Sequence, residues 1–329
     1  GGAGYIGSHT AWLLAKHNYN ILVLDTLYQK QPCEHSWATL IQGDFGDKPL
    51  LKDIFSRYHI AGVIHFGAFL AVGQSVKHPL IYYENNVVKT RTLLEAMVEH
   101  NVLNFVFSSS CAVYGYPQQL PLTEDHPRNP INPYGKTKYA VELMLEDCAQ
   151  AYGLNYVSLR YFNAAGVMPY EHLYEWHVPE THLIPLLLRS ALTNKKINVF
   201  GTDYATPDGT CVRDYIHVQD LASAHYKALK HIEAQHPSDV FNLGTGTGYS
   251  VQEVITAAQQ VTKKEILVNY ADRREGDPPI LVADATKAAN ILNWKPHSSD
   301  IKTILKTAWI AERTCFEQIQ KKHDANHTE

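Results

Sequence analysis

The first half of the chain alternates short apolar segments with longer stretches of helical pattern, and this rhythm limits the fold more than any other feature. The apolar segments are rich in Val, Ile and Phe, which favours buried strands. Parallel strands joined by crossover helices produce such an order, with helices on both faces of the sheet. The predicted strands are Ile21–Asp25, Thr39–Gln42, Gly62–Gly67, Asn104–Ser109 and Tyr156–Tyr161. The predicted helices are Tyr5–His17, Pro49–Tyr58, Tyr82–His100 and Tyr134–Tyr152.

The alternation ends after Asn163. The stretch Ala164–His182 is rich in Pro, Gly and aromatic residues and is predicted to be irregular, whereas residues 183–194, 219–234 and 250–262 have helical patterns. We therefore predict an α/β fold: a Rossmann-type, doubly wound parallel sheet in residues 1–163 and a smaller mixed α/β region in residues 164–329. Some segments of the second region are expected to return to the first.

A glycine turn opens the chain. Gly1, Gly4 and Gly7 form a GxxGxxG pattern, and the helix that follows offers free N–H groups and a partial positive charge to a pyrophosphate. The next strand ends at Asp25, where a carboxylate can accept hydrogen bonds from both adenosine ribose hydroxyls and repel a 2′-phosphate. The alternative is an ordinary turn, but the spacing to Asp25 favours a dinucleotide site, with NAD rather than NADP.

A turn of this kind normally follows a strand, and none precedes Gly1 in the sequence. We therefore expect that the chain lacks about half a dozen residues before Gly1, which would form the first strand. At the end of a later strand, Asp44 and Phe45 are in a position to contact adenine; a polar turn is the equally open alternative.

Tyr134 and Lys138 form a YxxxK motif at the start of a predicted helix. Residues four apart lie on one helix face, so the phenol and the ammonium are neighbours. The pKa of a free tyrosine is about 10. A nearby lysine cation, together with a nicotinamide cation, is expected to lower it and make Tyr134 a usable base. YxxxK also occurs by chance on ordinary surface helices.

The strand that starts at Asn104 runs directly into three serines, residues 108–110. Hydroxyls at the carboxyl end of a parallel strand lie where ligands bind in open α/β sheets. Ser110 can therefore hydrogen-bond a reacting hydroxyl and relay its proton to Tyr134. A serine-rich strand end without a function is the alternative. We interpret the adjacent Cys111 as a packing residue.

Together these motifs resemble the extended short-chain dehydrogenase/reductase family, and further segments resemble its UDP-glucose/UDP-galactose 4-epimerases. The resemblance covers nearly the whole chain, with its motifs in the family's order. The additional segments are Gly4–Thr10, Val72–Ser75, Tyr82–Val87, Leu159–Asn163, Val212–Val218 and Arg273–Asp277.

The resemblance implies an isomerase with tightly held NAD, a UDP-sugar site in residues 164–329, and a homodimer. It implies catalysis by Ser110, Tyr134 and Lys138. The implied cofactor contacts are Gly1, Gly4, Tyr5, Ile6, Gly7, Asp25, Asp44, Phe45, Phe66, Asn85, Ser108, Tyr134, Lys138 and Tyr161. The implied substrate contacts are Ser110, Asn163, His182, Leu183, Phe200, Arg213, Arg274, Asp277 and Leu281.

Two departures and two rival functions bear on this assignment. Leu70 stands where many relatives have a lysine, and the order Gly67–Ala68 inverts a common Ala-Gly pair. A 4,6-dehydratase of this fold would need an Asp-Glu pair after Ser110, where this chain has Cys111–Ala112. A non-catalytic NAD-binding regulator is disfavoured because both residues of the YxxxK motif are present.

Leu281 is expected to limit the space around the sugar's 2-substituent. Relatives with Tyr at this position reject N-acetylated sugars, whereas a smaller residue accepts them, so Leu281 predicts some conversion of UDP-GlcNAc to UDP-GalNAc. The alternative is that Leu281 is simply a core residue of a strand spanning Ile280–Ala283.

Composition excludes several other classes. The net charge of -4 gives no reason to expect nucleic acid or anionic membrane as a partner, and no apolar run is long enough to span a bilayer. The odd number of five cysteines, none in a CxxC pair, argues against a disulfide framework and favours a cytoplasmic location. The 18 histidines are scattered and show no HExxH motif, so we expect no metal.

Overall fold

The computed structural model describes residues 1–28, 36–168, 173–175, 177, 179–274 and 277–325, with the backbone alone for residues 319–325. Cys33 and Glu275–Gly276 of the RREGD motif lie outside the described residues. The four described cysteines are free thiols. None of the helices in the described ranges is both long and apolar enough to span a membrane.

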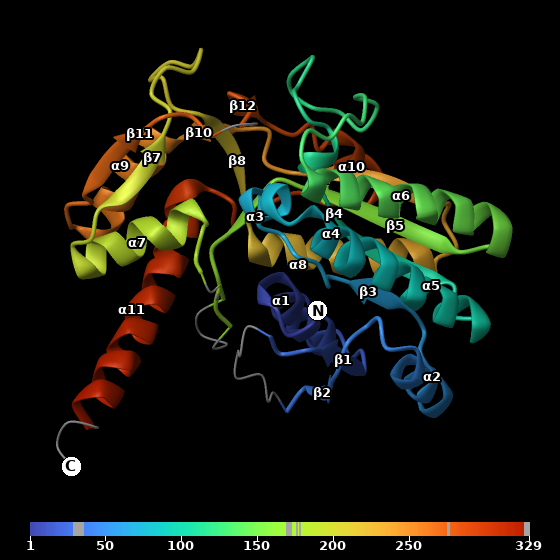
Figure 1. The fold of residues 1–329 in the computed structure, drawn as a ribbon. Helices are drawn as coiled ribbons and strands as arrows, with labels where there is room; N and C mark the ends of the chain where they lie inside the picture. The colour runs from blue at the N-terminus through green and yellow to red at the C-terminus, as the bar shows by residue number, and fades with distance from the viewer. Residues whose placement is uncertain (29–35, 169–172, 176, 178, 275–276, 326–329) are drawn as a thin grey trace.

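A parallel sheet forms the centre of the first half (Figure 1), as the strand–helix rhythm predicts. Its order is β3-β4-β5-β9, and every neighbouring pair is parallel. A separate parallel pair, β1-β2, lies beside it. The strands are β1 (Ile21–Asp25), β2 (Ala38–Gln42), β3 (Val63–His65), β4 (Asn104–Ser110), β5 (Asn155–Tyr161) and β9 (Asp239–Leu243).

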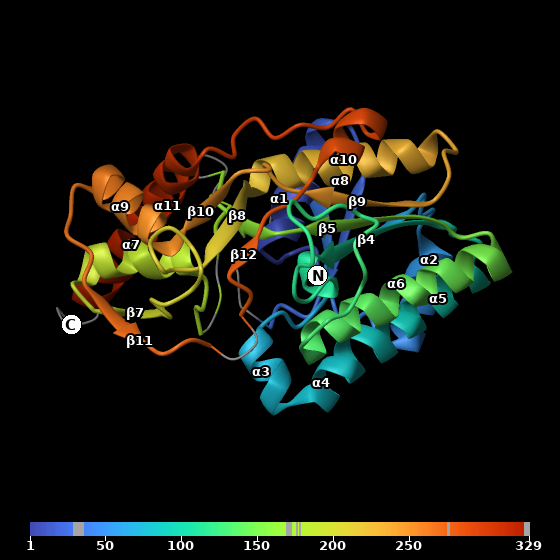
Figure 2. The same cartoon turned by 90° about the horizontal axis from the view of Figure 1, so that it is seen from above.

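Side chains of β4 alternate between two cores because successive residues of a strand point to opposite faces. Phe105 and Phe107 pack against helices α2, α5 and α6, whereas Val106 packs against α1 and α8. Figure 2 shows these helices as layers on opposite sides of the sheet. The helices are α1 (Tyr5–Lys16), α2 (Lys48–Arg57), α5 (Lys89–Glu99), α6 (Pro133–Tyr152) and α8 (Val218–Glu233).

The two parallel sheets meet at the start of the chain. The Gly1 nitrogen donates to the carbonyl of Leu24 at 2.7 Å, and a Cβ on Gly1 would lie 2.4 Å from the Gly67 nitrogen. Gly1 therefore lies between the end of β1 and the segment after β3. Among the described residues no strand pairs with both β1 and β3. The strand expected before Gly1 stays a prediction.

The single helix predicted for Tyr82–His100 is divided. The chain forms α3 (Val72–Lys77), α4 (Pro79–Tyr83), a π-helical turn η1 (Glu84–Val88) and then α5. Asn86, inside the π turn, accepts from the Phe69 nitrogen at 2.8 Å and donates to the Phe69 carbonyl at 3.0 Å. A π turn holds one more residue than an α-helical turn. Here it directs the Asn86 amide toward the loop after β3.

The second half forms the smaller mixed α/β region that the sequence predicts. Its central strand β8 pairs with β6 and β12 in parallel and with β10 in antiparallel orientation. Helices α7, α9 and α11 share one apolar core beside it. Its elements are β6 (Asn163–Ala165), α7 (Leu183–Thr193), β7 (Ile197–Phe200), β8 (Val212–His217), β10 (Gly248–Ser250), α9 (Val251–Thr262), β11 (Val268–Ala271), β12 (Ile280–Leu281), α10 (Thr286–Ile291) and α11 (Ile301–Ala325).

Candidate active site

A cavity of about 630 Å³ opens where the carboxyl ends of the parallel strands meet the second half of the chain. Its walls come from the glycine turn, the ends of β1, β3 and β4, the start of α6, and residues 175–185. Most of the predicted site residues line it. They are Gly1, Gly4, Tyr5, Ile6, Gly7, Asp25, Asp44, Phe45, Phe66, Asn85, Ser110, Tyr134, Lys138, Tyr161, Asn163, His182 and Leu183.

The glycine turn leaves no room for a side chain at Gly1 or Gly7. A Cβ on Gly7 would lie 2.5 Å from the Gly1 carbonyl oxygen and 2.8 Å from the Gly2 Cα. Gly4 precedes α1 without a side-chain cap, so the first N–H groups of the helix are available to a ligand. This bare helix start fits a pyrophosphate.

Asp25 ends β1 at the cavity wall. Its carboxylate accepts from the backbone nitrogens of Ala3 at 3.0 Å and Leu27 at 2.8 Å. These bonds fix the carboxylate beside the glycine turn, where the dinucleotide fold places the acidic residue that binds the adenosine ribose. Asp44 is held similarly, by an ion pair with Lys89 at 2.5 Å.

Helix α6 places the YxxxK motif. Asn132 caps the helix by accepting from the Gly135 nitrogen at 2.9 Å, and Pro133 occupies the first turn. Tyr134 therefore stands at the helix start, with the Lys138 nitrogen 5.9 Å from its ring centre. The Lys138 ammonium also donates to the Ser108 carbonyl at 2.8 Å, which links the motif to β4.

Burial dominates the electrostatics of the pair. It raises the pKa of Tyr134 well above its ordinary value, although the Ser110 hydroxyl opposes the shift. Burial also lowers the pKa of Lys138 to about 7, with Glu142 opposing. The amine therefore carries only part of its charge near neutral pH. The expectation that Lys138 and a nicotinamide cation together lower the pKa of Tyr134 concerns the enzyme with bound NAD and stays a prediction.

The three serines at the end of β4 have different partners. Ser109 donates to Glu142 at 2.6 Å, and the Ser108 hydroxyl lies 2.9 Å from that of Tyr161. Ser110 accepts from the Ala112 nitrogen at 3.2 Å and lines the cavity with Tyr134. Ser108, which was predicted to contact the cofactor, is 1% exposed and does not line the cavity.

The other predicted substrate contacts form a second group on β7, β8, β12 and the nearby loops. Arg213 pairs with Asp277 at 3.1 Å, and the Arg274 guanidinium lies 4.0 Å from the centre of the Phe200 ring. Leu281 is the register partner of Arg213 and packs against a small apolar cluster that includes Phe162, a residue of the cavity lining. Phe200, Arg213, Arg274, Asp277 and Leu281 do not line the cavity itself.

Several lining residues were not assigned a role from the sequence. Gln74 and Tyr82 lie in segments that carried the family resemblance, which was the available signal. Glu175 and His177 lie in the stretch expected to be irregular, where the spacing Glu-x-His-x-x-Glu-x-His at residues 175–182 went unused.

Comparison with known proteins assigns the family. The sequence profile of the NAD dependent epimerase/dehydratase family matches residues 1–244. The chain belongs to this family, which confirms the predicted resemblance, and NAD is its cofactor.

Individual relatives agree over almost the full chain. UDP-glucose 4-epimerase of Halalkalibacterium halodurans is 50% identical over 310 residues, 94% of this chain and 93% of the relative. The crystal structure of UDP-glucose 4-epimerase from Brucella ovis with NAD has a TM-score of 0.91 at 46% identity and covers 94% of this chain and 95% of that one. The Stenotrophomonas maltophila enzyme, with bound NAD and formylated UDP-arabinopyranose, has a TM-score of 0.91 at 36% identity, covering 96% and 97%.

Proposed function

We propose that the protein is a UDP-hexose 4-epimerase, an isomerase that interconverts UDP-galactose and UDP-glucose through transient oxidation at sugar carbon 4. The observation that carries this function is the shared cavity of the dinucleotide turn and of Ser110, Tyr134 and Lys138. The high coverage of relatives with this activity supports the substrate class.

The mechanism assigns one task to each group. Tyr134, as the phenolate, takes the proton from the sugar O4, and Ser110 relays it. Bound NAD would supply the chemistry of accepting a hydride from C4 and returning it. Lys138 would hold the nicotinamide ribose, and its ammonium form would support the phenolate charge. The 4-keto sugar would present its opposite face after rotation about the diphosphate link, and Tyr134 would return the proton to O4 as the hydride returns.

Arg213 and Arg274 would bind the diphosphate of the substrate, because guanidinium groups form bidentate hydrogen bonds with phosphate oxygens. Arg213 pairs with Asp277, and the Arg274 guanidinium lies over the Phe200 ring. A phosphate group would therefore compete with Asp277 for Arg213.

A dehydratase is the nearest rival, and Cys111 disfavours it. Burial raises the pKa of this thiol to about 12, so it remains protonated and unable to act as a base. The test is incubation of the purified protein with UDP-galactose. UDP-glucose formed without net nicotinamide reduction supports epimerisation. A 4-keto-6-deoxy product would identify a dehydratase, and absence of conversion would identify a non-catalytic NAD-binding protein.

We also propose that the enzyme accepts N-acetylated sugars. Leu281 is only partly buried and packs against the cluster that contains Phe162, so it fills less space there than a tyrosine would. Packing against this buried cluster also fits the alternative that Leu281 is a core residue.

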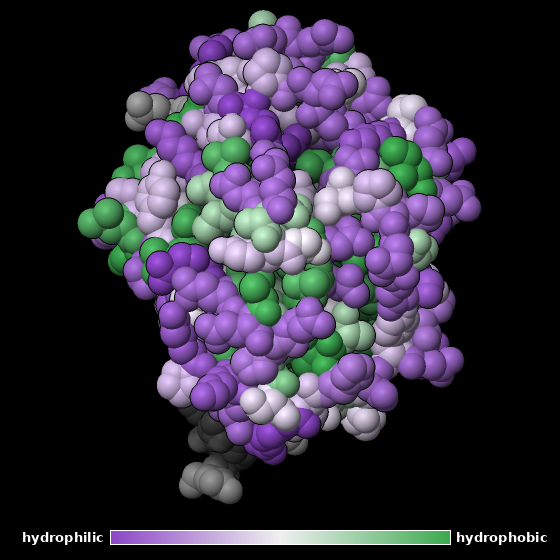
Figure 3. Space-filling model, turned by 90° about the vertical axis from the view of Figure 1, so that its right-hand side faces the viewer, coloured by the Kyte–Doolittle hydropathy of each residue, from purple (hydrophilic) through white to green (hydrophobic). Residues whose placement is uncertain are grey.

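A homodimer is the assembly we propose. Figure 3 shows one face of the molecule on which hydrophobic residues lie scattered among hydrophilic ones. Exposed apolar side chains gather instead on α3 and α4, which pack against α6. Val76, Leu80 and Ile81 are 61%, 81% and 55% exposed. Such a patch is typical of a protein interface.

The free thiols of the described cysteines favour a cytoplasmic location.

A further inference from the structure

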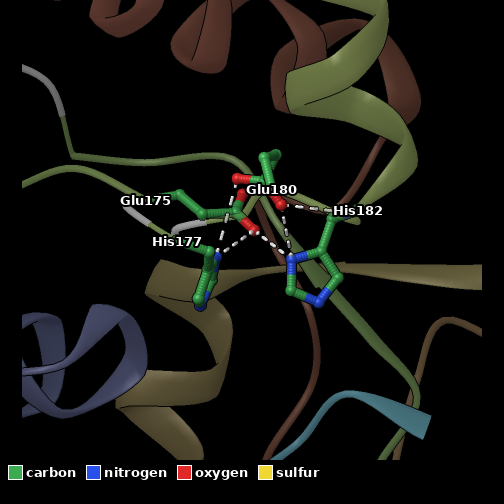
Figure 4. Close-up of side chains that lie close together, drawn as sticks. All are labelled: Glu175, His177, Glu180 and His182. Atoms are coloured by element: carbon green, nitrogen blue, oxygen red, sulfur yellow. Dashed lines mark hydrogen bonds and ion pairs between the residues drawn. The ribbon is translucent and has the colours of Figure 1, made fainter. Parts of the chain in front are cut away.

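Four side chains with metal-binding atoms converge between β6 and α7, at the edge of the cavity. Glu175, His177, Glu180 and His182 each offer one oxygen or nitrogen, and these atoms all lie within 4.8 Å of one another. Figure 4 shows both carboxylates directed at the two imidazole rings. The sequence-based expectation of no metal rested on the absence of HExxH or paired Cys/His spacings, which the pattern Glu-x-His-x-x-Glu-x-His does not match.

The ligand atoms are buried and have only one another as partners. The side chains of Glu175 and Glu180 are 5% and 3% exposed. One oxygen of each carboxylate, and Nδ1 of both histidines, forms no hydrogen bond of good geometry, although the carboxylates and imidazoles lie within ion-pair distance. Buried polar atoms in proteins are nearly always paired, and each unpaired one costs about 1–3 kcal/mol. Four such atoms that face one another indicate a shared partner.

Their spacing lets one ion contact all four residues. Nδ1 of His182 lies 2.9 Å from Oε1 of Glu175 and 3.2 Å from Oε1 of Glu180. Nδ1 of His177 lies 3.6 Å from Oε1 of Glu175 and from Oε2 of Glu180. Ligands at about 2.0–2.2 Å from a tetrahedral zinc ion lie roughly 3.3–3.6 Å apart, so a bound ion would draw together ligand atoms that now spread over 4.8 Å.

The negative charge of the cluster also favours a bound cation. The cluster holds two carboxylates, and Arg189 lies 3.7 Å from Glu180 but pairs with Glu312 at 3.0 Å. Among the described residues, Glu175 forms ion pairs only with His177 and His182 of the cluster, and Glu180 shares Arg189 with Glu312. We propose that Glu175, His177, Glu180 and His182 form a binding site for a divalent transition-metal ion, with zinc as the preferred ion. Two imidazoles favour zinc over magnesium or calcium, which prefer oxygen ligands.

Four protein ligands would close the site, so the ion has a structural role rather than a water-activating one. It would fix the segment before α7, which places His182 and Leu183 in the cavity wall. The His177 ring also meets the Tyr5 ring edge-on, 6.3 Å between centres, so the same ion would hold this segment against the start of α1.

The test uses the full chain as purified, with Zn²⁺ and Co²⁺ as probes. We expect the parent to retain one zinc ion per chain after dialysis, and Co²⁺ to give the strong visible absorption of a tetrahedral site. Zinc should raise the melting temperature, and a chelator should reverse the effect. Loss of an outer-shell group already costs about 10–100-fold in metal affinity, so His177→Gln and Glu180→Gln should each weaken binding at least about 100-fold.

The matched control is His59→Gln, which removes an exposed histidine outside the cluster and should behave like the parent. The Co²⁺ spectrum of the parent needs no variant, so the site remains testable if a substituted chain fails to fold. A parent that keeps no zinc, a Co²⁺ spectrum typical of octahedral coordination, or equal zinc retention in all chains would overturn the proposal.

Discussion

At the scale of single residues, the proposed mechanism depends on the Tyr134 hydroxyl. Tyr134→Phe keeps the ring and removes the oxygen that is proposed to take the O4 proton. Loss of a general base costs about 10²–10⁴-fold in rate. We therefore expect kcat to fall by this factor while the dissociation constant of UDP stays unchanged. A variant with a near-normal kcat would show that another residue is the base.

Lys138 predicts a pH dependence of stability. Below its pKa of about 7 the folded protein carries a buried charge, and above the ordinary pKa of 10.5 neither the folded nor the unfolded state is charged. The parent's free energy of unfolding should therefore rise from pH 7 to pH 10. Lys138→Met removes the charge and should be more stable than the parent at pH 7, with a gap on the order of a few kcal/mol.

Denaturant melts of both ligand-free proteins across this pH range measure that gap. It should shrink as the pH approaches 10. A constant gap would mean that the lysine is not desolvated, and a variant that is less stable at every pH would mean that its bond to the Ser108 carbonyl outweighs desolvation.

Leu281 tests substrate breadth. Leu281→Tyr should overfill the space beside Phe162 when the sugar carries an N-acetyl group, at a cost of about 1–3 kcal/mol. The measured quantity is the ratio of kcat/KM for UDP-GlcNAc to that for UDP-glucose. We expect the ratio to drop roughly 5–150-fold, on the basis of that energy range. An unchanged ratio would assign Leu281 to the core alone.

The serines show where sequence reasoning succeeds and fails at this scale. A run of hydroxyls at a strand end predicted a site, and Ser110 does line the cavity. The partners that turn Ser108 and Ser109 away, Tyr161 and Glu142, lie on β5 and α6. No local pattern encodes such pairings, so the sequence could not separate Ser108 from Ser110.

At the scale of elements, the start of α6 decides where Tyr134 stands. Asn132→Ala removes the cap and should cost about 1 kcal/mol in the free energy of unfolding. Because the frayed turn carries Tyr134, kcat should fall as well. Asp47→Ala is the control, because Asp47 caps α2 in the same way, by accepting from the Leu50 nitrogen, yet lies outside the cavity lining.

Thermal unfolding and initial rates on both cap variants distinguish the two roles. Similar losses of stability with a rate defect in Asn132→Ala alone would support the positioning role of the cap. Equal rate defects in both variants would show that the lower kcat of Asn132→Ala comes from general destabilisation of the protein.

Elements with local signals were predicted well, and those set by distant contacts were not. The limits of β1 match the prediction, and α6 begins one residue early, because Pro and Asn mark its start in the sequence. The π turn depends on Asn86, which bonds to Phe69 and to Thr137 on α6. The periodicity of apolar residues does not reveal these distant partners. One continuous helix was therefore predicted where the π turn interrupts it.

At the scale of the whole molecule, the exposed patch on α3 and α4 predicts the assembly. Leu80→Glu combined with Val76→Glu places charges in the proposed dimer interface, where their desolvation would be costly. We expect sedimentation to detect monomers at concentrations where the parent dimerises. Ile291→Glu, an exposed apolar position on α10, is the control. A dimer that survives the double change would place the interface elsewhere.

The two halves of the molecule also touch at the glycine turn. The Tyr5 hydroxyl donates to the Gly166 carbonyl, and His9 accepts from the Met168 nitrogen at 3.1 Å. Helix α1, whose start is the proposed pyrophosphate site, is therefore hydrogen-bonded to the segment just after β6. That segment leads to His182 and Leu183 in the cavity wall. This connection gives the two binding sites a direct structural contact, through which a change at one site could alter the affinity at the other. If bound cofactor changes the affinity for UDP by some factor, bound UDP must change the affinity for the cofactor by the same factor. Calorimetric titration of each ligand, with and without the other, would measure both factors.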